Sequence, residues 1–168
     1  MGQDIILNLF YENPTKEFHI REIARILKLS KTNIGYHINK LLKTNIIITK
    51  KGVFKSYIAN EDSKEYRYSK LLHGLKRIYD CGIIQYLEKI NPRCIVLFGS
   101  FAKAEYDINS DVDLFVQAPE QKLDLAKYEK KLKHKINVFF EPNINKLSPE
   151  LLNNIINGIK LSGHIKLK

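Results

Sequence analysis

Two aspartates lie two positions apart in the stretch SDVDLF, residues 110–115. Asp111 and Asp113 flank Val112 in an apolar run typical of a buried strand. Side chains alternate along a strand, so both carboxylates are expected on the same face. Two carboxylates held this close repel each other, and a bound divalent cation removes that cost. Mg²⁺ suits such a site because it takes few protein ligands and completes its shell with water and phosphate oxygens.

A Gly-Ser pair precedes the aspartates, directly after the apolar run CIVLF, residues 94–98. Gly99 allows close approach of the backbone to a ligand, and the amide and hydroxyl of Ser100 can donate to phosphate oxygens. Carboxylates that hold a metal, beside a turn that orients a triphosphate, fit phosphoryl or nucleotidyl transfer. The sequence therefore predicts Mg²⁺ or Mn²⁺ as the cofactor and an NTP, with ATP expected, as substrate or ligand.

Three short apolar runs supply the strands that must position these groups. They are CIVLF, DVDLFVQ and INVFF, and their composition is that of strands buried in a sheet. Apolar periodicity predicts helices before, between and after the three runs, at residues 71–90, 123–132 and 148–161. Ser148 is placed to cap the last helix, with Pro149 at its first position.

The complete motif, Gly99-Ser100 followed by Ser110-Asp111-Val112-Asp113-Leu114, resembles the signature of the polymerase beta-like nucleotidyltransferases, in particular their minimal, single-domain prokaryotic branch. The resemblance extends over about residues 68–168. It implies that the two aspartates are catalytic metal ligands and that the nucleotide is bound by Gly99, Ser100 and Ser110. Lys103 stands where the family often has a basic residue, so it is expected either to contact phosphate or to be a simple solvated lysine.

Two positions depart from this family pattern. Ala104 replaces the usual glycine and would be strained if the position requires a positive φ. Asn137 stands where active members carry a third carboxylate, which binds metal and helps to deprotonate the attacking hydroxyl; an amide cannot act as a base at neutral pH. Glu141 has the same strand parity but lies roughly 13 Å further along an extended strand, so it is a candidate for the third site position only if the strand ends and the chain folds back. Turnover and nucleotide binding without turnover both stay open.

The N-terminal part of the chain predicts a different fold. Helical periodicity marks residues 5–10, 20–27 and 31–42, with Ser30 placed to cap the third helix, and two β-branched runs around Lys51-Gly52 predict a hairpin. The stretch LSKTNIGYHINKLLKTNIIITKKGVFKSYIA resembles the winged-helix domains of many prokaryotic regulators, over roughly residues 1–60. Asn45 replaces a common glycine there and tolerates the left-handed conformation.

Basic and polar side chains on this part favour double-stranded DNA as a partner. Residues 1–60 hold ten Lys or Arg and four Asp or Glu, in a chain of 168 residues with net charge +10. The third helix would read base edges and contact phosphates, and the hairpin lysines would contact the backbone. The predicted DNA-binding residues are Lys31, Thr32, Asn33, Tyr36, His37, Lys40, Lys50, Lys51 and Lys55. Twofold DNA sites favour a homodimer.

We assign the chain to the α+β class: a winged helix-turn-helix domain at 1–60, a polar linker at 61–67, and a small nucleotidyltransferase-like α/β domain with a short mixed sheet at 68–168. No apolar run is long enough for a membrane span, and the first residues do not resemble a secretory signal, so we expect a cytoplasmic protein. Cys81 and Cys94 are expected to be buried, reduced thiols.

Three functions fit these features. The first is a transferase that moves NMP from Mg·NTP to a protein or nucleic-acid acceptor and is coupled to DNA by the winged helix. The second is a transcriptional regulator whose degenerate transferase domain senses nucleotide, as Asn137 and Ala104 suggest. The third rests on the resemblance alone: minimal nucleotidyltransferases often serve as antitoxins that modify or mask a partner toxin.

Overall fold

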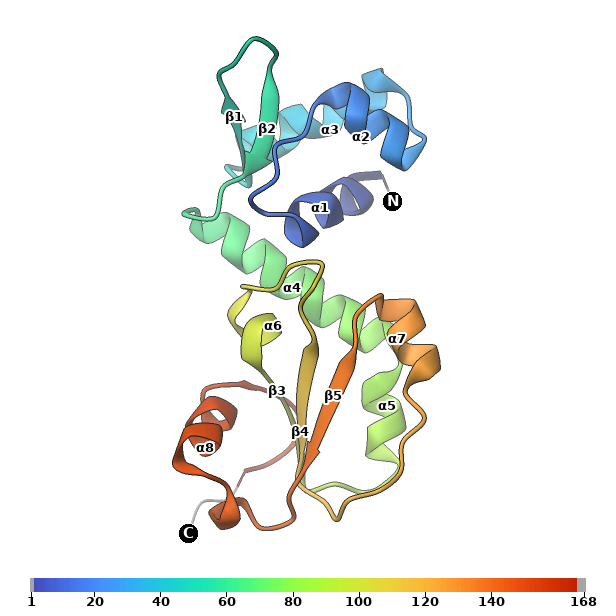
Figure 1. Cartoon of the computed structure of the whole chain (residues 1–168), viewed down its shortest axis with the longest axis vertical. Helices are drawn as coiled ribbons and strands as arrows, with labels where there is room; N and C mark the ends of the chain where they lie inside the picture. The colour runs from blue at the N-terminus through green and yellow to red at the C-terminus, as the bar shows by residue number, and fades with distance from the viewer. Residues whose placement is uncertain (1, 166–168) are drawn as a thin grey trace. The chain divides into compact units, whose positions relative to one another are not determined.

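The computed structural model describes residues 2–165, and these divide into two compact units (Figure 1). The first unit ends at Lys70 and the second begins at Leu71. Helix α4, Lys64–Cys81, contributes residues to both units, so residues 64–67 of the expected linker are helical. Within residues 2–165, no helix combines the length and the apolar character that crossing a bilayer would require.

The first unit has the element order of a winged helix-turn-helix, as predicted. Three helices precede a two-stranded antiparallel hairpin, and the elements are α1 Gly2–Glu12, α2 Ile20–Leu27, α3 Lys31–Lys43, β1 Ile47–Lys50 and β2 Ser56–Ala59. The core is formed by apolar side chains at the predicted helical spacing, which are fully buried: Ile6, Phe10, Ile23, Ile34, Ile38 and Leu41. The ring of Phe10 packs edge-on against Phe18, with centroids 5.3 Å apart.

Local signals fix the turns of this unit. Lys28 ends α2 in the left-handed region at φ 54°, and Ser30 then begins α3 by accepting a hydrogen bond from the Asn33 amide at 3.2 Å. Asn45 adopts φ 57°, which confirms the expectation of a left-handed residue between α3 and the hairpin.

Tyr11 of α1 donates to Ser69 at 2.6 Å, and burial raises the pKa of Tyr11 to about 12.

The cap at Ser30 gives a first stability prediction. Ser30→Ala leaves the Asn33 amide without its side-chain acceptor, so the free energy of unfolding of the first unit should fall by about 1 kcal/mol. Ser148→Ala is the matched control, because Ser148 caps α8 in the second unit by accepting from Leu151 at 3.3 Å. Hydrogen exchange resolved by unit should show each loss in its own unit only. Equal loss of protection in both units after Ser30→Ala would contradict this expectation.

The second unit is built on a four-stranded mixed sheet of order β5-β4-β3-β6, in which only β4 and β5 run parallel. Its elements after α4 are α5 Ile83–Glu88, β3 Cys94–Phe98, α6 Gly99–Lys103, β4 Val112–Val116, α7 Ala126–Leu132, β5 Ile136–Phe140, the 3₁₀ helix η1 Ile144–Lys146, α8 Pro149–Ile156 and β6 Ile159–Gly163. The three predicted strands are therefore present, and the α+β class is confirmed.

Alternation along β3 and β4 separates the two faces of this sheet. Val96, Phe98 and Phe115 form one cluster with Ile155 of α8. Because Phe98 pairs with Asp113, the carboxylate of Asp113 lies on the same face as this cluster. Figure 1 shows α8 on one side of the sheet and α5 and α7 on the other. The predicted site thus lies on the α8 face.

Three helix predictions were wrong in extent. The helix expected at residues 123–132 begins at Ala126, as α7. The helix expected at residues 71–90 is interrupted at Gly82, whose φ of 90° ends α4 before α5 begins. The closing helix expected at 148–161 ends at Ile156, and the following residues form β6, which pairs with β3. Gly158 makes this turn possible, because a Cβ there would lie 2.5 Å from the Leu97 carbonyl oxygen.

Both cysteines are buried, free thiols, as expected. Burial raises the pKa of the Cys81 thiol and of the Cys94 thiol, so both stay protonated at neutral pH. Cys94 donates to the Gln117 side chain at 3.6 Å inside the core of the second unit. These thiols belong to the packing of the fold.

Candidate functional site

The two carboxylates converge on the side chain of Asn137. Asp111 directly precedes β4, Asp113 is its second residue, and Asn137 is the register partner of Asp113 on the parallel strand β5. The Asn137 amide donates from Nδ2 to Asp113 Oδ1 at 3.0 Å and to Asp111 Oδ2 at 3.3 Å. All three side chains are half-buried. One amide therefore satisfies two carboxylates that would otherwise repel each other.

This arrangement is compatible with a divalent cation. Both carboxylate oxygens lie within 3.3 Å of one nitrogen, so Asp111 and Asp113 could hold the same cation, which would neutralise their charges. The Asn137 side chain would then have to rotate and offer its oxygen as a third, neutral ligand. Among residues 2–165 no cluster of three or more His, Cys, Asp or Glu side chains is arranged to hold a metal. Asp111 and Asp113 are thus the two carboxylates that this cluster could offer to a cation.

The Gly-Ser turn lies directly against the carboxylates. Gly99 begins α6 with φ 71°, and a Cβ built on it would overlap Asp113 Oδ2. Only glycine satisfies both conditions, so the turn after β3 can approach the carboxylate closely. Ser100, the next residue, is half-buried, and its carbonyl accepts from the Glu105 amide at 2.9 Å, which closes the α6 loop.

The other end of the α6 loop carries the alanine that departs from the family pattern. Ala104 has φ 58°, so the position does require the left-handed region, and alanine is strained there. Lys103, immediately before it, is exposed at the end of α6. The family's usual glycine would relieve this strain.

Two of the predicted site residues have hydrogen-bond partners away from the carboxylates. Ser110 accepts from the Asp107 amide at 2.9 Å through Oγ, so its hydroxyl closes the turn at 107–110. Glu141 lies beyond the end of β5, past the pairing of Phe140 with Val116, and accepts from the Asn143 amide at 2.8 Å. It is therefore at the opposite end of the strand from Asn137 and does not join the carboxylate cluster.

Sequence reasoning missed His134 behind the aspartates. Its ring is buried, stands edge-on to Phe101 with centroids 5.0 Å apart, and Nδ1 lies 2.7 Å from the Ser110 carbonyl oxygen. In the tautomer with a proton on Nδ1, this ring donates to the peptide that leads into Asp111. The only sequence signal for the hydrogen bond to Ser110 is that His134 stands two residues before β5.

The predicted DNA-binding residues form two exposed groups on the first unit. Those on α3 are Lys31, Thr32, Asn33, Tyr36 and Lys40, and those on the hairpin are Lys50, Lys51 and Lys55. Lys40 Nζ lies 5.7 Å above the Tyr36 ring. His37 differs from these because it is half-buried and lies against the start of α1, where a Cβ on Gly2 would be 2.9 Å from its Nε2.

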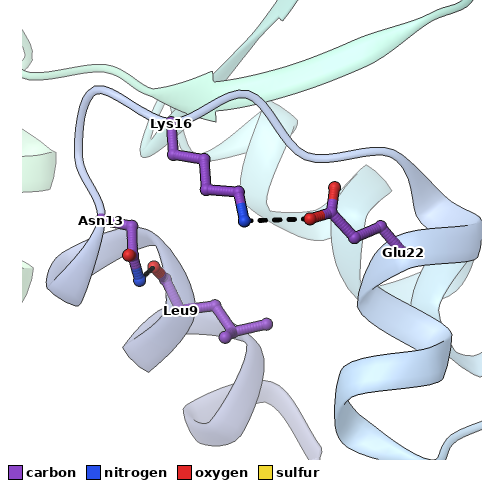
Figure 2. A network of polar contacts seen from close by, with 4 residues as sticks. All are labelled: Leu9, Asn13, Lys16 and Glu22. Atoms are coloured by element: carbon purple, nitrogen blue, oxygen red, sulfur yellow. Dashed lines mark hydrogen bonds and ion pairs between the residues drawn. The ribbon is translucent and has the colours of Figure 1, made fainter.

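A groove between α2 and the hairpin adds residues that the sequence reading had left out. It has a volume of about 730 Å³ and is lined by His19, Ile20, Arg21, Glu22, Arg25, Phe54, Lys55 and Tyr57. Figure 2 shows Lys16 reaching from the loop after α1 to Glu22, with Nζ 3.0 Å from Oε1. This contact lowers the pKa of Glu22, and Lys16 offsets its charge.

Two family models match the chain. Residues 82–163 match the family described as Polymerase beta, Nucleotidyltransferase, and this range contains the Gly-Ser turn, both aspartates and Asn137. Residues 5–49 match Bacterial regulatory protein, arsR family, and this range contains most of α1, all of α2 and α3, and the beginning of β1. No curated protein and no solved structure matches the chain.

Proposed function

Since the chain joins an arsR-type helix-turn-helix domain to a nucleotidyltransferase domain of the polymerase beta type, we propose that it binds Mg·NTP in the second unit and double-stranded DNA through the first. The observation that carries the nucleotide half is the convergence of Asp111 and Asp113 on one amide beside the Gly99 turn. Acidic side chains with a phosphate-compatible turn suit a metal-bound triphosphate.

Each residue then has a defined task. Asp111 and Asp113 would hold Mg²⁺, which when bound neutralises the triphosphate and polarises the phosphoryl group that is transferred. The Gly99 turn lets the backbone approach the phosphates, and Ser100 donates to them. His134 positions the peptide that leads into Asp111. Lys103 adds a positive charge at the end of α6.

Deprotonation of an acceptor hydroxyl is the step for which this site is poorly equipped. The Asn137 side-chain amide already donates one hydrogen bond to each carboxylate, and it cannot accept a proton at neutral pH. Asp111 and Asp113 are needed as metal ligands. Transfer of NMP to a protein or nucleic-acid acceptor is therefore expected to be slow compared with binding of Mg·NTP.

Calorimetry with Mg²⁺ and a non-hydrolysable ATP analogue tests the nucleotide half directly. The chain should bind the analogue in the presence of Mg²⁺ and release it when EDTA is added. Glu141→Gln is the control and should bind as the wild type does, because Glu141 lies away from the carboxylates. Labelled ATP with candidate acceptors then measures transfer. The proposal fails if the analogue binds equally well with and without Mg²⁺, or not at all.

The arsR-type domain supports the DNA half, through α3 and the hairpin. Lys51 is exposed directly after β1, and we place it against the phosphate backbone of the duplex. Lys51→Ala should weaken binding to all sequences alike and reduce the salt slope, d log K/d log[salt], by about 0.9 in magnitude. Fluorescence anisotropy over a salt series measures this, with Lys122→Ala of the second unit as the control. A sequence-selective loss would show instead that Lys51 reads bases.

A nucleotide-sensing regulator is the second candidate, and the amide of Asn137 favours it. A site that lacks a general base can still bind Mg·NTP. If the protein has one conformation with high and one with low affinity for DNA, and Mg·NTP binds them unequally, nucleotide shifts the affinity for DNA. The measurement is the DNA dissociation constant with and without Mg·NTP. Equal constants would exclude this function.

Either function places the protein with DNA and nucleotide in the cytoplasm. A homodimer on twofold DNA would show as a doubled mass by ultracentrifugation.

A further inference from the structure

The tip of the β1–β2 hairpin carries two large apolar side chains in solvent. Val53 is 96% exposed and Phe54 is 76% exposed. The base of the same hairpin is anchored, because Tyr57 is buried and pairs with Phe18 through backbone hydrogen bonds of 2.8 and 2.9 Å. A firmly held ribbon that presents adjacent apolar side chains at its tip is typical of an interaction site.

Charge around the tip indicates a polyanion as the occupant. Lys50, Lys51 and Lys55 flank the two apolar residues and are exposed, and no acidic residue occurs from position 50 to position 55. Phe54 and Lys55 also line the groove of about 730 Å³ beside α2, to which Arg21 and Arg25 contribute. The carboxylate that lines this groove, Glu22, is already paired with Lys16. An apolar protein partner would gain nothing from this ring of cations, whereas duplex DNA would.

We propose that Val53 and Phe54 act as an apolar wedge in the minor groove of duplex DNA, where they partly unstack one base step and bend the helix. This inference rests on the proposed DNA binding and goes beyond it by assigning the tip a mechanical role. Neither side chain can donate or accept a hydrogen bond, so Val53 and Phe54 cannot read base edges through hydrogen bonds. Apolar side chains inserted between base steps kink DNA, and flanking cations hold the phosphates on either side.

The composition of the tip favours a wedge over a stacking platform for single strands. Stacking platforms use flat aromatic rings for successive bases, and valine has no ring to offer. A branched aliphatic side chain next to an aromatic one matches instead the residue types that pry base steps apart. The wedge would select flexible pyrimidine–purine steps, so sequence preference at this position would arise from DNA deformability.

The experiment uses the full chain and a duplex selected from a random-sequence pool by the wild-type protein. Bending is measured by energy transfer between dyes at the two ends of the duplex, and unstacking by 2-aminopurine fluorescence. Phe54→Ser should reduce both signals and weaken binding about tenfold, while leaving the salt slope unchanged because no charge is lost. Lys51→Ala should instead reduce the magnitude of the salt slope and leave the bending of the DNA unchanged.

A matched control separates the wedge from general loss of an exposed aromatic residue. Tyr68 is 68% exposed on α4, so Tyr68→Ser removes a similar side chain outside the hairpin and should leave bend and affinity unchanged. Circular dichroism should show that each variant is folded. The proposal is overturned if Phe54→Ser bends DNA as the wild type does, if bound wild-type DNA is straight, or if single strands outcompete the duplex. Absence of any wild-type binding to DNA would instead refute the proposed DNA function itself.

Discussion

Asp113→Asn should remove most of the stabilisation of the second unit by Mg·NTP. In the wild type, nucleotide at 100 times its dissociation constant should raise the free energy of unfolding by about 2.7 kcal/mol, through binding to the folded state alone. Asp113 supplies one of only two carboxylates that converge on the Asn137 amide. Its loss leaves the cation with one charged ligand, and affinity should fall about 100-fold or more. Thermal unfolding with and without Mg·NTP measures the effect.

The metal-free protein provides the internal control for this variant. Asparagine has the same shape as aspartate, and its introduction removes the repulsion between two neighbouring carboxylates. Asp113→Asn should therefore unfold within about 0.5 kcal/mol of the wild type, or above it, when no metal is added. A variant that is stable alone and still gains the full stabilisation from Mg·NTP would show that Asp113 is not a metal ligand.

The strands of the site could be predicted because their signal is local. CIVLF, VDLFV and INVFF are short apolar runs, and β3 is buried along its whole length, as such a run predicts. Alternation then placed Asp111 and Asp113 on one face, and the structure brings both to one amide. The caps at Ser30 and Ser148 also follow from rules that act within a few residues. The left-handed conformation of Asn45 and Ala104 is indicated only by the glycine that the resembled families have at these positions, because a local rule disfavours it for alanine.

Features that depend on distant residues could not be predicted in this way. The bond from His134 to the Ser110 carbonyl spans 24 positions, and the groove beside α2 joins residues 19–25 to residues 54–57. Strand β6, IKLSG, is another example, since its apolar residues also fit the helical spacing that predicts a helix up to residue 161. It forms because Gly158 allows the chain to approach β3 closely enough to pair with it. Long-range register, which local propensity does not encode, decides these contacts.

Asn137→Asp should speed the transfer of NMP by the proposed nucleotide site. The new carboxylate would take the register position beside Asp113 on β5, where it can both ligate the cation and accept a proton from an acceptor hydroxyl. General-base assistance contributes about 10²- to 10⁴-fold to a rate, so labelled NMP transfer should rise by about 100-fold at least. The measurement is single-turnover transfer from labelled ATP, with the acceptor identified for the wild type or with water as the acceptor.

Without metal, Asn137→Asp should lower the stability of the protein, and this second effect makes the prediction specific. Aspartate removes the two hydrogen bonds that the Asn137 amide donates and places three carboxylates together, so the metal-free variant should lose about 2–3 kcal/mol of stability. Mg²⁺ should restore that loss. Asn137→Ala is the control, because it removes the amide without adding a base and should not speed transfer. Tighter Mg²⁺ binding by Asn137→Asp without faster transfer would mean that deprotonation is not the limiting step and would favour the nucleotide-sensing regulator.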